Sequence, residues 1–190
     1  MHLIEPHYSW RDVYISENDQ NSPFFGREYS EFYFTNTIYD HYIHPQWDYF
    51  GSDTLFLKII YADYSFGFTI IELLGEWNDC LYNDIMFFKR NVIEPLLNKG
   101  IDKFILIGEN IFNFHVSDDS YYEEWFEELG DGWIVALNFR DHVKQEFFSE
   151  QLDNFIYMGG NFDTYIDWRS YKPFRLFTKI KDQLIRRLQQ

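Results

Sequence analysis

Four ionisable residues follow the predicted strands of this sequence at the points where those strands end. Glu76 and Glu109 follow two of the strands, and Arg140 and His142 follow a third. Carboxylate, guanidinium and imidazole groups support general acid–base chemistry when they converge. Ligands of open α/β sheets bind outside the carboxyl ends of the strands. These four residues are therefore a candidate ligand cluster, with ordinary loop and helix-capping roles as the alternative, and no residue is assigned a catalytic role.

The sequence offers little that would hold a cofactor or a metal ion. No serine, cysteine or lysine stands out as a nucleophile, and no glycine-rich phosphate loop follows a strand. Asp40, His41, His44 and Asp48 are of the types that bind zinc or another divalent ion. Because neither a CxxC nor an HExxH motif accompanies them, we interpret them as polar loop residues and expect no cofactor and no metal.

The elements that must position these side chains alternate along the chain. Their order, β-β-α-β-α-β-α-β-α, predicts an α/β fold with a mixed, mostly parallel sheet that a β-hairpin starts and helices packed on the sheet. Gly75 is expected to end the second strand, and Pro95 predicts a kink or break of the first helix within 91–94. The strands are expected at 55–61, 66–74, 104–107, 133–137 and 155–158, and the helices at 80–99, 118–129, 141–152 and 172–190.

The composition indicates one globular unit with an N-terminal arm. The 190 residues are 22% aromatic, and residues 1–54 are expected to form an aromatic-rich arm packed on an α/β core of residues 55–190. Large exposed apolar patches mark interfaces, so the segment 24–50 is an alternative surface for homo-oligomerisation. The single cysteine, Cys80, excludes an internal disulfide and is expected to be buried. With no apolar run long enough to cross a bilayer and no visible export signal, we expect a cytoplasmic protein.

The net charge of −15 is unevenly distributed. Residues 1–168 carry −21 and residues 169–190 carry +6. The overall charge argues against nucleic acid as a partner, because phosphates are bound by lysine and arginine. The acidic segment 118–128 is either a solvated helix face or a docking surface for a basic partner. The C-terminal helix is either docked on its own acidic body, a helix that binds a partner, or a membrane-surface helix; its apolar stripe consists of Phe174, Phe177, Ile180, Leu184 and Leu188.

The element order over about residues 55–160 resembles that of STAS domains, the fold of the anti-sigma-factor antagonists and their SpoIIAA-like relatives. The resemblance rests on the two-strand start, Leu-Leu-Gly-Glu at 73–76 before a long helix, the strand at 104–107 and a serine-containing helix start. It implies a non-catalytic regulatory or protein-interaction domain, with Ser117 and Ser120 as possible phosphorylation sites. An acidic Ser-Asp-Asp-Ser stands where the family carries an Asp-Ser-Ser-Gly-like motif, and these acids oppose an added phosphate. The alternative is a small-molecule-binding protein or small enzyme that uses the ligand cluster.

Overall fold

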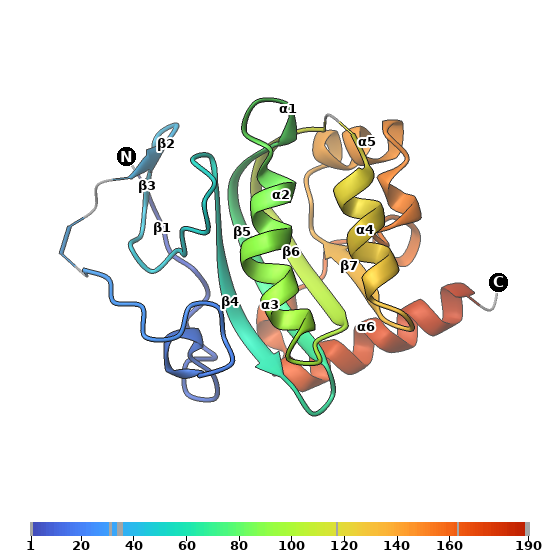
Figure 1. Cartoon of the computed structure of the whole chain (residues 1–190), viewed down its shortest axis with the longest axis horizontal. Helices are drawn as coiled ribbons and strands as arrows, with labels where there is room; N and C mark the ends of the chain where they lie inside the picture. Colours follow the sequence, from blue (N-terminus) through green and yellow to red (C-terminus); the bar gives the residue numbers. More distant parts are fainter. Residues whose placement is uncertain (1, 31, 34–35, 117, 163, 189–190) are drawn as a thin grey trace.

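A mixed four-stranded sheet forms the centre of the protein (Figure 1). The computed structural model describes residues 2–30, 32–33, 36–116, 118–162 and 164–188. The strand order is β4-β5-β6-β7, with β4 antiparallel to β5 and the remaining pairs parallel. The predicted hairpin start and mostly parallel sheet are therefore confirmed.

The strands and helices have the following bounds. The strands are β1 His2–Ile4, β2 Thr37–Ile38, β3 His41–Ile43, β4 Leu55–Asp63, β5 Phe68–Asn78, β6 Lys103–His115 and β7 Trp133–Leu137. The helices are α1 Asp79–Tyr82, α2 Asp84–Phe88, α3 Glu94–Leu97, α4 Ser120–Glu128, α5 Asp141–Ser149 and α6 Pro173–Leu188. Short 3-10 turns lie at Ser16–Asn18, Leu152–Asn154, Gly160–Phe162 and Trp168–Ser170, and a π-helical turn lies at Lys89–Ile93. Among the described residues, no helix is both long enough and apolar enough to cross a membrane.

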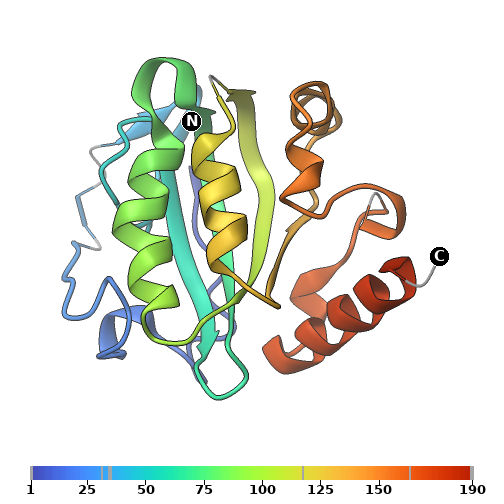
Figure 2. The same cartoon turned by 45° about the vertical axis from the view of Figure 1, so that its right-hand side comes forward.

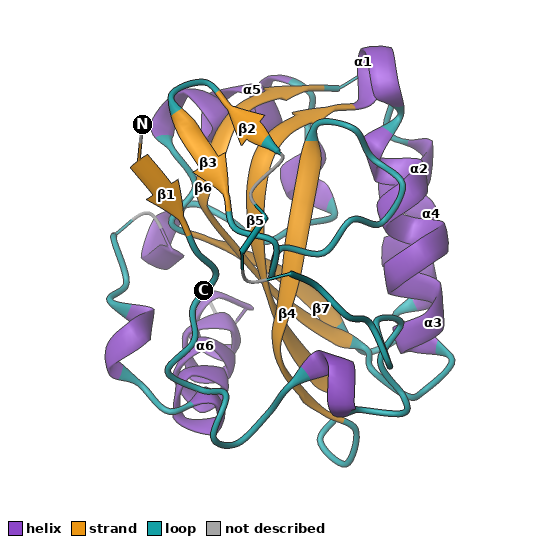
Figure 3. Ribbon diagram, turned by 90° about the vertical axis from the view of Figure 1, so that its left-hand side faces the viewer, coloured by secondary structure: helices purple, strands orange, loops and turns teal. Residues whose placement is uncertain are grey.

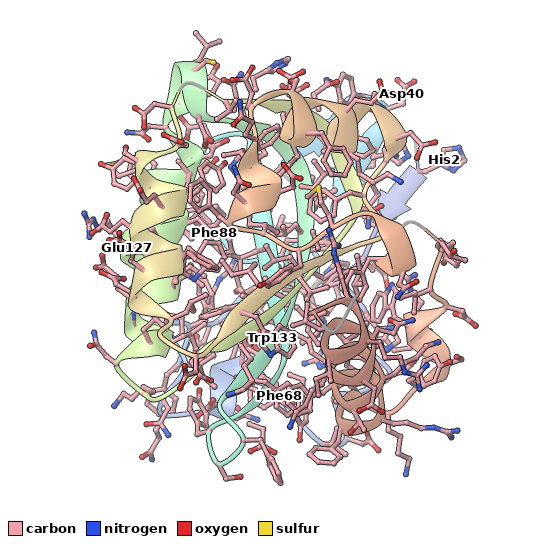
Figure 4. The ribbon with its side chains drawn as sticks, turned by 90° about the vertical axis from the view of Figure 1, so that its right-hand side faces the viewer. His2, Asp40, Phe68, Phe88, Glu127 and Trp133 are labelled. Carbon is pink, nitrogen blue, oxygen red and sulfur yellow. The ribbon has the colours of Figure 1, made fainter. Side chains whose placement is uncertain are left out.

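The two faces of the sheet are covered by different parts of the chain. Helices α2 and α3 follow one another along one axis, and α4 lies beside them on one face of the sheet, here called the helix face (Figure 2). Helix α5 also contributes Val143 and Phe147 to the core on this face. Helix α6 packs on the opposite face, here called the arm face, through Phe177 and its neighbours. In Figure 4, Phe68 and Trp133 lie beside α6. Both rings stack on the ring of Phe177, whose centroid is 4.0 Å from that of Phe68 and 5.9 Å from that of Trp133.

Helix α6 docks on the sheet through apolar contacts. The buried members of its predicted stripe are Phe177, Ile180 and Leu184, whereas Phe174 is 44% exposed and the side chain of Leu188 lies outside the described residues. The lysines and arginines of α6 point elsewhere, and none of them makes an ion pair with a carboxylate among the described residues. The described contacts that dock α6 on the sheet are therefore apolar, with no direct ion pair among them.

The predicted first helix is interrupted once, between α1 and α2, and then continues from α2 through a π-helical turn into α3. Asn83 adopts a left-handed conformation with φ of 53° between α1 and α2. The π-helical turn then precedes α3, where Pro95 occupies the first turn. Proline lacks the N–H that would continue the α-helical ladder, and a π-helical turn precedes it. The kink or break expected within 91–94 therefore takes the form of a π-helical turn over Lys89–Ile93, through which the backbone stays helical.

Strands β5 and β6 extend well past their predicted ends. Gly75, expected to end its strand, lies inside β5 at an irregularity of the β5–β6 register. Its φ is +126°, and a Cβ atom there would lie 2.1 Å from the carbonyl oxygen of Thr54. The glycine therefore serves close approach of a neighbouring backbone rather than termination. As a result, Glu76 and Glu109 lie within strands and not in loops beyond them.

Two further predictions differ from the structure. The strand expected at 155–158 is reduced to one parallel bridge between Tyr157 and Val135. The chain turns into the 3-10 helix Gly160–Phe162 soon afterwards, which leaves too few residues for a ladder. Cys80, expected to be buried, is exposed on the single turn of α1, where its Sγ lies 2.9 Å from the Val116 carbonyl oxygen. The buried residue of this single turn is Asp79, and Cys80 lies on its exposed side.

The N-terminal arm forms a small sheet of its own, of strand order β1-β3-β2. Figure 3 shows it lying across β4 and β5 on the arm face. Ile43 and Trp47 of the arm pack on Phe56 and Leu74 of these strands. Farther along the same face, Trp10 joins the apolar cluster under α6.

Candidate functional site

A row of charged side chains crosses the arm face between two apolar clusters. Alternation along β5 directs Phe68, Ile70, Glu72 and Leu74 to this face, because successive residues of a strand point to opposite sides. Lys58 of β4 lies directly opposite Glu72 in the antiparallel register. On the other side, β6 pairs Ile107 with Glu72, and Glu109, two residues farther along β6, shares Arg169 with Glu72. We call Lys58, Glu72, Glu109 and the groups bound to them the polar row.

Glu72 is the most deeply buried carboxylate of the row, with 1% of the residue exposed. Its Oε2 accepts a hydrogen bond from the backbone N–H of His7 at 2.8 Å, and its Oε1 lies 3.4 Å from Nη2 of Arg169. Burial raises the pKa of Glu72 to about 7, although both of these donors act to lower it. Glu72 is thus a group that exchanges a proton near neutral pH.

Glu109 lies in a more polar environment. Its carboxylate accepts hydrogen bonds from Nη1 of Arg169 at 2.6 Å, from Nδ2 of Asn138 at 2.8 Å and from Nε1 of Trp168 at 2.9 Å. Burial works to raise the pKa of Glu109, but these three donors together lower it below its ordinary value. The two neighbouring glutamates therefore have pKa values displaced in opposite directions, a pattern common to acid–base sites.

His7 of the N-terminal arm contacts Glu72 of the polar row. Its ring makes edge contacts with Trp10 and Trp168, whose centroids lie 4.9 and 4.8 Å away. Burial, together with the positive charge of Arg169, lowers the pKa of His7 to about 4. The imidazole is consequently neutral at neutral pH and adds no charge to the row.

The β4 end of the row is a network of ion pairs. Lys58 pairs with Glu17 and, at 3.3 Å, with Asp48, and Arg27 pairs with Asp48 as well. Burial raises the pKa of Asp48 to about 6 despite these two cations. The carboxylate of Asp48, one of the residues considered for metal binding, is therefore directed at cations of its own chain. His41 instead stacks on Phe112 with centroids 6.1 Å apart.

One group of three acids in the described part of the chain has the spacing to hold a metal ion: Glu94, Glu124 and Glu128. The ammonium group of Lys89 lies among them, 3.1, 3.1 and 2.9 Å from their oxygens. The side chain of Lys89 is fully buried, and Arg90 pairs with Glu94 and Glu124. The chain thus supplies its own cation at this position.

The structure places three of the four residues of the predicted ligand cluster along β6, but their charged groups do not meet. Arg140 lies against β6, with Nε 3.4 Å from the Glu109 carbonyl oxygen and its guanidinium 4.6 Å from the centre of the Phe112 ring. Nε2 of His142 lies 2.7 Å from the Phe112 carbonyl oxygen. These contacts engage the backbone of β6, whereas the carboxylate of Glu109 faces the polar row.

The fourth residue, Glu76, lies apart with other partners. Its carboxylate accepts hydrogen bonds from the Tyr39 hydroxyl and, at 3.2 Å, from Nδ2 of Asn113. The extension of β5 past Gly75 carries Glu76 up the sheet, under the small sheet of the arm. Its carboxylate is therefore bound to the arm and not to Arg140 or His142.

Sequence reasoning missed Glu72 and Arg169. Glu72 had a local signal, since it is the one charged residue in the apolar run 68–74 and a charge within such a run is a candidate buried group. Arg169 had no such signal, because it lies 97 residues from Glu72 in the sequence and contacts it only in the folded chain.

Of the two serines considered for phosphorylation, Ser117 lies outside the described residues. Ser120 is exposed and is the first residue of α4. Its backbone N–H donates to the carboxylate of Asp118 at 2.9 Å, and its hydroxyl donates to the same oxygen.

The fold and the polar row together define an α/β protein with a mixed sheet and a buried, internally paired set of charges. Comparison with protein-family models gave no match, and comparison with curated proteins gave none either.

Proposed function

We propose that this protein is a non-catalytic protein-interaction domain that binds its partner through the outer surface of the N-terminal arm. The observation that carries the proposal is the exposure of large aromatic side chains on this arm. Phe32 is 87% exposed, Tyr33 77%, Tyr8 66%, Tyr39 59% and Tyr49 55%. Exposed apolar groups of this size and density mark protein interfaces, in which tyrosine is enriched.

Three carboxylates of β5 and β6 also favour a non-catalytic role. Glu72, Glu76 and Glu109 all accept hydrogen bonds from donors of the chain itself. Glu72 in addition has almost no solvent contact. A catalytic acid or base must reach a proton of its substrate directly or through one water. These groups therefore favour a structural role, in which they fasten the arm and the segment around Arg169 to the sheet.

A hollow of about 250 Å³ in the arm gives the partner an anchoring point. Its aromatic lining consists of Tyr29, Tyr33, Trp47, Tyr49 and Phe56. Drug-sized ligands occupy pockets of about 300–1,000 Å³, so this hollow suits one side chain of a protein better.

Charge indicates the kind of side chain that the hollow takes. Residues 1–54 contain nine Asp and Glu against two Arg. A basic partner complements this surface. Aromatic faces attract ammonium and guanidinium groups, and the rings of Tyr33, Trp47 and Tyr49 line the hollow. Glu28 adds an acid to this lining, and the one arginine of the lining, Arg27, is paired with Asp48. We therefore infer that the partner inserts a lysine or arginine.

The test is affinity capture from the source cell with three forms of the protein. The arm variant carries Tyr33→Ala and Tyr49→Ala, and the control carries Tyr165→Ala, which removes a tyrosine that is 64% exposed outside the arm. We expect a protein that is recovered with the wild type and the control and is lost with the arm variant. Recovery that is equal in all three forms would refute the arm as the binding surface.

The STAS-like assignment and its phosphorylation switch are part of this proposal. They are supported by the order of β4, β5, α2–α3, β6, α4, β7 and α5 and by the exposed Ser120 at the start of α4. The positive end of the helix dipole favours a phosphate there, whereas Asp118 and Asp119 oppose it. Binding of the captured partner to Ser120→Glu and Ser120→Ala forms tests the switch, which requires the two forms to differ.

A small-molecule-binding role is the second candidate, and the contacts at 109–112 favour it. Arg140 and His142 converge on this segment of β6, beside the oppositely shifted pKa values of Glu72 and Glu109. Thermal unfolding with a panel of anionic metabolites tests this role. A ligand that raises the melting temperature of the wild type and not of the Arg140→Ala variant is required, and its absence removes the candidate.

A further inference from the structure

Helix α6 presents positive charge that the protein itself does not neutralise. Arg186 is exposed and makes no ion pair among the described residues. Arg175 and Lys179 face the Tyr171 ring at 5.8 and 4.6 Å, and Nζ of Lys179 donates to the Tyr171 hydroxyl at 2.8 Å. These contacts leave the cationic charge without a counter-charge. In a chain of net charge −15, a basic helix of this kind is free for an external partner.

The outer side of α6 is also hollowed. A groove of about 420 Å³ runs along the helix and is lined by Tyr171, Arg175, Lys179, Asp182, Gln183 and Arg186. The spacings of four, three and four residues from Arg175 through Lys179 and Asp182 to Arg186 place these four on one face of the helix. We call this lined face the α6 groove.

The order of charges along the α6 groove is positive, positive, negative, positive. A uniform polyanion would meet Asp182 with repulsion. A protein segment that carries a lysine or arginine among its acids would instead satisfy all four charges. Charge complementarity of this kind sets specificity at protein interfaces.

The surroundings of the groove argue against extended polyanions as well. The 16 residues of α6 span about 24 Å, which is a few times the screening length of about 8 Å at physiological salt. A long nucleic acid or an anionic bilayer would extend beyond α6 and come against a body of charge −21. The apolar stripe of α6 is buried on the sheet, so its buried members are not available to enter a membrane.

We propose that the α6 groove binds an acidic segment of a protein partner, with a single basic residue placed opposite Asp182. This surface is distinct from the arm and goes beyond the function proposed above. The lined stretch from Arg175 to Arg186 is about 17 Å long at a rise of 1.5 Å per residue, enough for an extended segment of about five residues at roughly 3.3 Å each. Arg175, Lys179 and Arg186 supply the ion pairs, and the Tyr171 ring supplies an apolar contact at one end.

Fluorescence anisotropy with three defined probes tests the proposal. The probes are a labelled peptide of glutamates with one lysine, a single-stranded DNA of similar length, and vesicles of phosphatidylserine and phosphatidylcholine. The groove variant carries Arg175→Glu, Lys179→Glu and Arg186→Glu. The control carries Lys99→Glu, Lys172→Glu and Lys181→Glu, three exposed lysines outside the groove lining, and thus has the same net charge.

We expect the wild type and the control to bind the peptide with similar affinity and the groove variant to bind it at least about tenfold more weakly. Replacing the lysine of the peptide by glutamate should weaken binding to the wild type, and Asp182→Lys should restore it. Tighter binding of DNA or vesicles than of the peptide would overturn the proposal, as would equal peptide binding by the two triple variants. A salt-sensitive dimer of the wild type that only the groove variant loses would assign the groove to a second copy and would also overturn it. The Tyr33→Ala, Tyr49→Ala form should bind the peptide normally, which separates this proposal from that for the arm.

Discussion

Replacing Glu72 by glutamine should make the protein less sensitive to rising pH. Glu72 is ionised in the unfolded chain above its ordinary pKa of 4.5, but in the folded protein its pKa is about 7. The folded state therefore holds a proton that the unfolded state releases, and stability falls as pH rises from about 4.5 to about 7. Glutamine has the shape of the protonated acid and still accepts the N–H of His7 through its carbonyl oxygen. The variant lacks the ionisation that causes the loss.

The size of the effect follows from the displacement of the pKa. A rise from 4.5 to about 7 corresponds to about 3 kcal/mol, at 1.36 kcal/mol per unit. Nearly all of this loss is present at pH 8, and less than about 1 kcal/mol of it is present at pH 5. Comparing the variant with the wild type at both pH values removes any cost that does not depend on pH, including the altered contact with Arg169. We expect the variant to gain about 2 kcal/mol relative to the wild type between pH 5 and pH 8.

Urea unfolding followed by tryptophan fluorescence measures this difference. Glu109→Gln is the matched control, because it shares Arg169 as a partner and its pKa is lowered. A carboxylate with a lowered pKa stabilises the fold above its ordinary pKa and loses that contribution as pH falls through the folded value. Glu109→Gln should therefore cost more stability at pH 8 than at acidic pH. If Glu72→Gln behaved as Glu109→Gln does, the ion pair with Arg169 would outweigh burial and the reasoning would be wrong.

Three further substitutions address other parts of the fold. Gly75→Ala should lower the free energy of unfolding by about 3 kcal/mol, seen as a lower urea midpoint. Both the φ of +126° and the carbonyl oxygen 2.1 Å from the new Cβ oppose a side chain at this position. An unchanged midpoint would refute the close approach. Lys89→Met should cost about 1–3 kcal/mol at pH 7, because it leaves three glutamates without the cation between them. The cost should be smaller at a pH below the lowered pKa of Glu94, where that carboxylate no longer needs a cation, as thermal unfolding at both pH values would show. Tyr122→Phe removes a 2.6 Å hydrogen bond to buried Asp79, whose pKa is raised by burial to about 6. The loss of folding stability, about 1–3 kcal/mol, should therefore be larger at pH 8 than at pH 5. A loss independent of pH would contradict an ionised Asp79.

The order of strands and helices could be predicted because it depends on local patterns. Apolar runs such as 104–107 and 133–137 have the length and residue types of buried strands, and Pro95 cannot continue a helical ladder wherever it occurs. The ends of β5 could not be predicted in this way. Gly75 is a common strand terminator, and only the Thr54 carbonyl packed against it shows that it lies inside the strand.

The candidate site, too, was predictable in its local residue types and not in its long-range contacts. The residue types at 109, 140 and 142 marked a region that does come together around β6. The direction of each side chain could not be predicted, because it depends on strand extension and on the register irregularity between β5 and β6. Glu76 consequently binds Tyr39 of the arm, and Glu109 binds Arg169 from a distant part of the chain.

The sequence by itself determined that Glu72 interrupts an apolar strand and that residues 169–190 carry +6 in an acidic chain. The tertiary structure decided what became of both charges. Glu72 is covered by His7 and Arg169, and burial in low dielectric raises its pKa, whereas the cations of α6 make no ion pair with a described carboxylate. The physical reason is that alternation along a strand or helix selects a face, but the energy of a charge depends on the groups that distant segments bring to that face.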